Sequence, residues 1–132
     1  MKIEDSTHIN LEHEEVILPF GKFYFFKHFV ISEINEGVHF DWNKVKITAE
    51  IMTNHYGAIN NLTYISNRIN SYSIEPQSWL KFDRYQLVKS TGIVAYDKKG
   101  GISVVLERLF SKGSIKIFRS LKKAIEWASL QD

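Results

Sequence analysis

Short runs of β-branched and aromatic residues alternate along the chain with longer stretches in which apolar residues recur every three or four positions. The short runs predict β-strands, and the longer stretches predict amphipathic helices that pack against them. The expected strands are Glu15 to Phe20, Lys22 to Lys27, Phe29 to Ile34, Leu62 to Ser66, Leu87 to Tyr96 and Ser114 to Phe118. The expected helices lie near residues 42–56, 75–82, 102–111 and 120–130.

Two of these helices have clear end signals. Asp41 is a good N-cap and Gly57 a good C-cap for the helix near residues 42–56, whose apolar positions form one stripe. Ser120 is the expected N-cap of the last helix. Trp127 lies on the apolar side of that helix, so we expect it to face the core.

The order of the elements predicts an α/β fold. An antiparallel opening precedes βαβα units, so we expect a mixed sheet of four to five strands with helices packed on it. Residues 1–13 show no period and are expected to form a loose N-terminal arm. Residues 14–132 contain no linker or repeat and should form a single domain.

The closing stretch from Phe118 to Trp127 contains the pattern Ser-Leu-x-x-Ala-Ile-x-Trp. With the element order from Glu15 to Leu130, it resembles the STAS superfamily in its SpoIIAA-like bacterial branch. The resemblance implies a STAS/SpoIIAA-like fold and a non-catalytic role, such as a regulatory partner of another protein. In the anti-sigma antagonists of that family, a Ser in an Asp-Ser-x-Gly setting is phosphorylated. The corresponding segment here, Asn70 to Pro76, contains Ser-x-Ser but lacks the Asp and the Gly.

A polar loop, Ser66 to Ser73, follows the expected buried strand that starts at Leu62. In open α/β sheets, loops at the carboxyl ends of strands are where ligands and partners usually bind. The candidate binding residues are Arg68, Asn70, Ser71 and Ser73. Ser73 is also the expected N-cap of the next helix and the candidate phosphorylation site. The alternative is a loop whose Asn and Ser side chains bond only their own backbone.

Aromatic residues near this loop are assigned to the core, namely Tyr64, Tyr72 and Trp79.

The composition limits the chemical reactions that the chain could catalyse. The chain of 132 residues has no Cys, which excludes disulfides, thiolate nucleophiles and thiolate metal ligands. His8 and His13 lack the spacing of a metal site, and no Gly-rich phosphate motif is present. We therefore expect no enzyme activity, no metal and no cofactor.

Charge is distributed unevenly along the chain. Residues 1–60 carry a net charge of −4 and residues 61–132 a net charge of +6. The basic residues are scattered and not clustered with stacking aromatics, so we expect no nucleic-acid binding. No stretch approaches the roughly 20 apolar residues of a membrane span, and no signal peptide is recognisable. We expect a cytoplasmic protein.

Three functions are compatible with these features. The first is a non-catalytic binding or regulatory module that recognises another protein through the loop, and a homodimer is a further expected assembly. The second is a carrier of a small lipid or nucleotide, enclosed by the strand Phe23 to Phe26 and the helix near residues 42–56. The third is a small enzyme, for which the sequence offers no reacting group.

Overall fold

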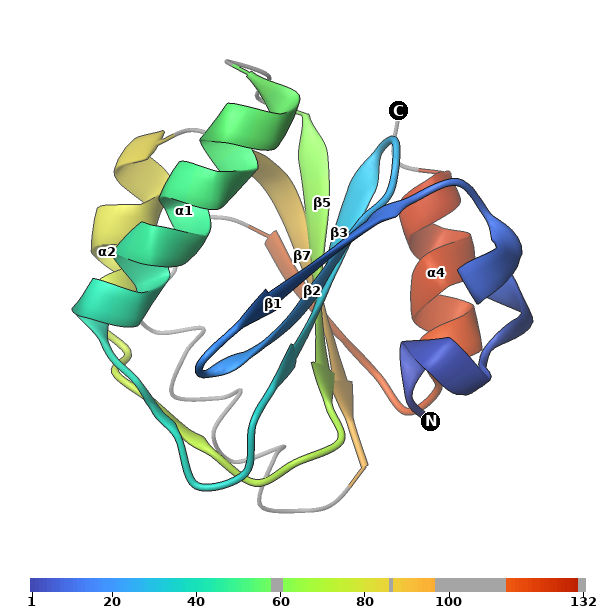
Figure 1. Ribbon diagram of the computed structural model, residues 1–132, viewed down its shortest axis with the longest axis horizontal. Coiled ribbons are helices and arrows are strands. Elements are labelled where there is room, and N and C mark those ends of the chain that lie inside the picture. Colours follow the sequence, from blue (N-terminus) through green and yellow to red (C-terminus); the bar gives the residue numbers. More distant parts are fainter. Residues whose placement is uncertain (58–60, 86, 97–113, 131–132) are drawn as a thin grey trace.

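The computed structural model describes residues 1–57, 61–85, 87–96 and 114–130 (Figure 1). Its main sheet has six strands in the order β1-β2-β3-β5-β7-β8. These strands are β1 (Glu14–Leu18), β2 (Gly21–Phe25), β3 (Phe29–Ile34), β5 (Leu62–Arg68), β7 (Val88–Ala95) and β8 (Ser114–Phe118). The first three pair antiparallel, and β3, β5, β7 and β8 pair parallel. The mixed α/β class with an antiparallel opening is confirmed, with more strands than the four to five expected.

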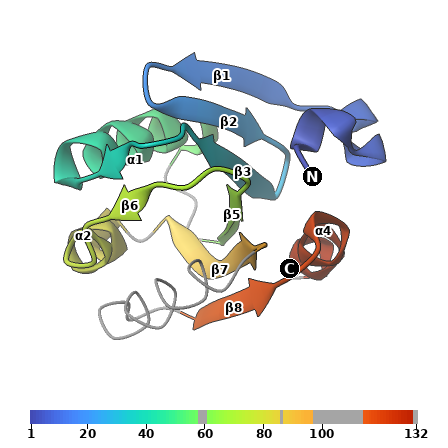
Figure 2. The same ribbon diagram turned by 90° about the horizontal axis from the view of Figure 1, so that it is seen from below.

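Helices cover both faces of this sheet. Figures 1 and 2 show α1 (Trp42–Tyr56) and α2 (Ser78–Phe82) on one face, and α4 (Leu121–Ser129) with the N-terminal segment on the other. A second, two-stranded parallel sheet joins β4 (His39–Phe40) to β6 (Ser73–Ile74). Strands of two residues leave no readable period, so the sequence pattern did not predict this small sheet.

The sheet separates two apolar cores. Phe23 and Phe25 pack into the core beneath α1, while Tyr24 packs into the core beneath α4. Successive residues of a strand point to opposite faces, so an unbroken aromatic run requires cover on both sides. The aromatic composition of β2 follows directly from this two-sided burial.

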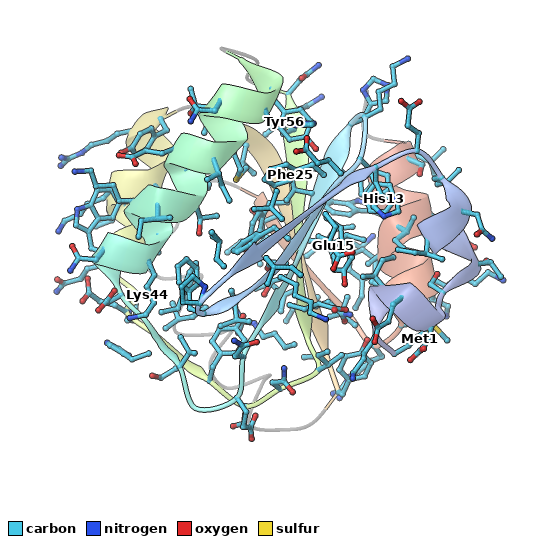
Figure 3. All side chains as sticks on the ribbon, viewed as in Figure 1. Met1, His13, Glu15, Phe25, Lys44 and Tyr56 are labelled. Atoms are coloured by element: carbon cyan, nitrogen blue, oxygen red, sulfur yellow. The ribbon has the colours of Figure 1, made fainter. Side chains whose placement is uncertain are left out.

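Helix α1 begins and ends where its cap residues predict. The Asp41 carboxylate accepts the Lys44 backbone N–H at 3.3 Å, which also lowers the pKa of Asp41. Gly57 closes the helix with a positive φ of 74°, a conformation that favours glycine. Near that end, the Tyr56 side chain lies beside Phe25 (Figure 3), and the two ring centroids are 5.6 Å apart.

The helix α2 is shorter than expected, and the side chain of Trp127 is less deeply buried than its apolar neighbours on α4. The helix expected at residues 75–82 starts only at Ser78, and a 3-10 turn, Asp83–Tyr85, follows it. Trp127 packs against the core beneath α4 as expected, but it is only partly buried, and its ring lies against that of Phe118. The helix expected near residues 102–111 falls outside the described residues.

The N-terminal segment is not the loose arm that we expected. It forms two short 3-10 helices, Ile3–Asp5 and Thr7–Asn10, beside α4 (Figure 1). Ile3 is completely buried in the core beneath α4, and its N–H donates to the Glu33 carboxylate at 2.8 Å. A single buried apolar residue in a polar segment creates no period, which explains why the sequence pattern missed it.

Candidate functional site

Strand β5 ends in polar side chains that face opposite sides of the sheet. Ser66 and Arg68 line a cavity on the side of α1 and α2, whereas Asn67 bonds the N-terminal segment. The sequence placed the end of this strand at Ser66. The strand instead continues to Arg68, because its pairing with β7 extends to Ala95. Arg68 is therefore held by a sheet and not by a loop.

A small cavity of about 30 Å³ lies at this end of β5. Such a volume holds a water molecule or a small chemical group, and ligand pockets typically measure roughly 300–1,000 Å³. Its apolar walls come from β4, α1, β5, β6 and α2, through Phe40, Val45, Tyr64, Ile74 and Phe82. Its polar lining consists of Thr48, Ser66, Arg68, Tyr72 and Ser78.

Three of these polar residues form a connected cluster. Ser66 Oγ lies 3.0 Å from the Tyr72 hydroxyl, and Arg68 Nε donates to the same Ser66 oxygen at 3.2 Å. The Arg68 guanidinium carbon lies 5.6 Å from the centroid of the Tyr72 ring, within cation–π range. These contacts fix a positive charge beside the cavity. A guanidinium held in one orientation is suited to bind a carboxylate or phosphate.

Residues 69–75, which we call the lip, continue from Arg68 and run parallel to residues 34–40. Both segments are held in one shape by backbone and side-chain hydrogen bonds. The bonds run from Asn70 Nδ2 to Ile34 O (3.0 Å), Gly37 N to Ser71 O (2.8 Å), Ser73 N to Val38 O (3.0 Å) and Glu75 N to Phe40 O (3.2 Å). The lip is thus held against residues 34–40, and its outer edge is exposed.

Three of the four predicted binding residues belong to the lip, and the fourth, Arg68, ends strand β5 just before it. Arg68 lines the cavity, and half-buried Asn70 holds Ile34 with its side-chain amide. Ser71 and Ser73 are both exposed, and the backbone N–H of Ser71 is held by a Glu36 carboxylate oxygen. The structure therefore places the four residues in sequence along one edge and does not gather them around one point.

Ser73 does not cap a helix, so that prediction is wrong. It belongs to β6, and its Oγ lies 2.7 Å from His39 Nδ1. α2 begins only at Ser78, whose hydroxyl donates to the Glu75 carboxylate at 3.0 Å. A phosphoryl group on Ser73 would therefore meet His39 and not the N-terminus of a helix.

Sequence reasoning missed two members of the site and placed one neighbour correctly. Tyr72 packs against the core as expected, and in addition its hydroxyl and ring contact Ser66 and Arg68, which the sequence did not predict. His39 carried no signal, because its contact with Ser73 spans 34 positions of the chain. Tyr64 is buried as expected, and the Trp79 side chain lies outside the described residues.

A buried carboxylate lies on the opposite face of the same strands. Glu33 is only 5% exposed, and its Oε2 accepts hydrogen bonds from Ile3 N–H and Asn67 Nδ2, both at 2.8 Å. Asn67 in turn accepts the Tyr96 hydroxyl at 2.7 Å and donates to Met1 O at 2.8 Å. Burial raises the pKa of Glu33, although its two hydrogen bonds oppose that shift. Burial also raises the pKa of Tyr96 to about 12.

The described residues form neither a metal site nor a membrane-spanning helix. Within them, no three His, Asp or Glu side chains come together as a potential metal site. His13, one of the two His weighed as a ligand, stacks against Phe26 with ring centroids 5.0 Å apart. No helix in the described part of the chain has the length and apolar character needed to cross a bilayer.

Comparison with known proteins identifies the fold. No family model matches the sequence, and neither does any curated protein. Among solved structures, the chain is similar to an uncharacterised protein of the DUF3478 family from Shewanella loihica PV-4, described as having a SpoIIAA-like fold. The TM-score is 0.57 at 10% sequence identity, over 89% of this chain and 92% of that chain. The chain therefore has a SpoIIAA-like fold, and the resemblance read from its sequence is confirmed at that level.

Proposed function

We propose that this chain is a non-catalytic, cytoplasmic binding module of the regulatory kind, and that the lip is the surface by which it recognises a partner protein. The observation that supports this proposal is the hydrogen-bonded attachment of the lip to residues 34–40. A polar segment that is already held in its bound shape loses little conformational entropy on binding. Its exposed edge carries Ser71 and Ser73 on either side of Tyr72 in the chain, and the Arg68 guanidinium lies over the Tyr72 ring.

Arg68 indicates the chemistry of the partner. Its orientation on Tyr72 and Ser66 suits a carboxylate or a phosphoryl group at the contact. The cavity beside it, at about 30 Å³, has room for a small group of the partner but not for a lipid or a nucleotide. Phe23 and Phe25, which the carrier hypothesis placed around a ligand, pack into the core. Protein recognition is therefore favoured over transport of a small ligand.

The contact between Ser73 and His39 resembles part of a nucleophilic catalytic site. A hydroxyl within hydrogen-bond distance of an imidazole is the first requirement of a nucleophilic site. Both side chains are exposed, however, and nucleophilic catalysis relies on a water-excluding environment around the reacting atoms. We propose a recognition role for this pair, in which it presents its hydrogen-bonding groups to the partner.

Site-specific photo-crosslinking tests the proposal directly. Benzoylphenylalanine is introduced in place of Ser71 on the lip, and the protein is irradiated in a lysate of its native host. The matched control carries the same group in place of Lys122, an exposed residue of α4 on the opposite face of the sheet. We expect a discrete crosslinked protein with the Ser71 probe alone. The same products from both positions, or none from Ser71, would contradict recognition through the lip.

A further inference from the structure

A second surface feature lies next to α2. An open groove of about 390 Å³ is lined by Trp42, Lys81, Arg84 and Tyr85, and we call it the α2 groove. Trp42 is the first residue of α1, Lys81 belongs to α2, and the other two follow in the 3-10 turn. All four lining residues are aromatic or cationic.

Three of the four side chains that line the groove lie close together. Lys81 Nζ lies 5.2 Å from the Trp42 ring centroid, and the Trp42 and Tyr85 centroids are 6.3 Å apart. Lys81 and Arg84 are exposed, and Tyr85 is 37% exposed. Trp, Tyr and Arg are the residues that most often dominate the energy of protein interfaces. The groove thus combines two aromatic rings with two cations, one of which, Lys81, lies over the Trp42 ring, and this combination suits a ligand that carries both negative charge and an aromatic ring.

We propose that the α2 groove binds an acidic peptide segment of a partner protein, with one aromatic side chain of that segment packed against Trp42 and Tyr85. The carboxylates of the segment would pair with Lys81 and Arg84. This site goes beyond the function proposed for the lip, because it uses different residues and does not require the lip to bind anything.

Single-stranded nucleic acid offers the same combination of charge and rings but fits the groove less well. Its recognition uses aromatic platforms on which bases stack and a positive path that follows the phosphates. The Trp42 and Tyr85 rings are inclined at 39° to each other, and the groove lining contains two cations. Lys122 and Lys123 lie on α4, across the sheet from the groove, and do not extend its charge (Figure 2). These features favour a peptide.

Nuclear magnetic resonance titration of the full chain provides the test. The probe is the peptide Glu-Glu-Phe-Glu-Glu, and the readout is the indole N–H signal of Trp42, assigned by its loss in Trp42→Phe. We expect a saturable shift of this signal, and a much smaller one with Glu-Glu-Ala-Glu-Glu or Lys-Lys-Phe-Lys-Lys. The Lys81→Gln/Arg84→Gln protein should bind the first peptide roughly tenfold more weakly, because two charge pairs are lost.

The controls separate this proposal from its alternatives. Lys122→Gln/Lys123→Gln removes the same charge on the opposite face and should leave the affinity unchanged. Arg68→Ala/Ser71→Ala should also bind the peptide as the wild type does, so failure of the lip hypothesis would not be mistaken for failure of this one. Equal affinity of the Lys81→Gln/Arg84→Gln protein would overturn the proposal. A larger Trp42 shift with oligothymidylate than with the acidic peptide would overturn it as well, in favour of nucleic acid.

Discussion

The indole ring of Trp127 lies over Gly92, with its Cζ3 atom 3.0 Å from the position that a Cβ atom would occupy at residue 92. Phe118 Cε2 lies 3.3 Å from the same position, and the Phe118 and Trp127 ring centroids are 5.2 Å apart. The absence of a side chain on β7 thus allows α4 and β8 to pack closely on the sheet. Glycine is required at position 92 because the Trp127 ring approaches the strand closely, whereas glycine is favoured at position 57 because the backbone there has a positive φ.

Gly92→Ala should destabilise the protein by about 1–3 kcal/mol, the usual cost of adding a methyl group to a well-packed site. Denaturant melts of Gly92→Ala, Trp127→Phe and the double variant would measure the effect. Because the smaller Phe ring relieves the clash, the two changes should be less than additive. Strict additivity would mean that the methyl group is accommodated without moving the indole.

Trp127→Ala should cost about 2–3 kcal/mol of unfolding free energy. Complete burial would give about 3–5 kcal/mol, but the ring is partly exposed and loses less contact when removed. Urea melts of the variant provide the measurement, with Trp127→Leu as a comparison that keeps part of the apolar volume. A loss below about 1 kcal/mol would show that the contact with Gly92 contributes little to the attachment of α4.

Glu33 should make stability depend on pH. Its pKa is raised above the ordinary value of 4.5, so the folded protein retains this proton to a higher pH than the unfolded chain does. Its contribution to the unfolding free energy is therefore fully present below the unfolded pKa and is lost as pH rises through the folded pKa. A Gln at this position can accept the same two hydrogen bonds without a charge, so Glu33→Gln should gain stability relative to wild type as pH rises above 4.5.

Urea melts of wild type and Glu33→Gln at several pH values from acid to neutral would measure this difference. Glu50→Gln, which removes an exposed carboxylate from α1, serves as the matched control. A difference between wild type and Glu33→Gln that stays constant with pH would show that the Glu33 carboxylate reaches water in the folded protein.

Most of the fold could be predicted from the sequence because its elements have strong local signals. α1 has a capping side chain, an apolar stripe and a terminal Gly, and its predicted bounds match the structure. β3 and β8 are dense or alternating apolar runs, and their bounds were predicted equally well. The short pair β4 and β6 could not be predicted, because two-residue strands are stabilised by partners distant in the chain.

The position of the candidate site in the fold could be predicted from the sequence, but the contacts of its side chains could not. The carboxyl end of β5 was identified from general rules of sheet topology, and Arg68 does line the cavity there. The partners of Ser73 and of the buried N-terminal segment could not be predicted, because both depend on contacts with strands far along the chain. His39 lies 34 positions from Ser73, and Ile3 lies 30 positions from Glu33.

Ser73→Ala and Asp41→Ala should differ in their effects on stability. Asp41 caps α1, so its removal should cost about 1 kcal/mol of unfolding free energy. Ser73 makes an exposed contact with His39 and caps no helix, so its removal should cost less than about 0.5 kcal/mol. Denaturant melts of both variants test this assignment. A larger loss for Ser73→Ala than for Asp41→Ala would restore a structural role for Ser73.

The affinity of the Arg68→Ala protein for the partner identified by crosslinking through Ser71 tests the central claim most directly. Calorimetric titration would compare wild type, Arg68→Ala and the surface control Lys122→Ala, with thermal melts to verify that each variant is folded. We predict that Arg68→Ala weakens binding at least about tenfold, equivalent to about 1.4 kcal/mol, while Lys122→Ala binds as the wild type does. Equal affinities for all three folded proteins would contradict recognition through Arg68 and the lip.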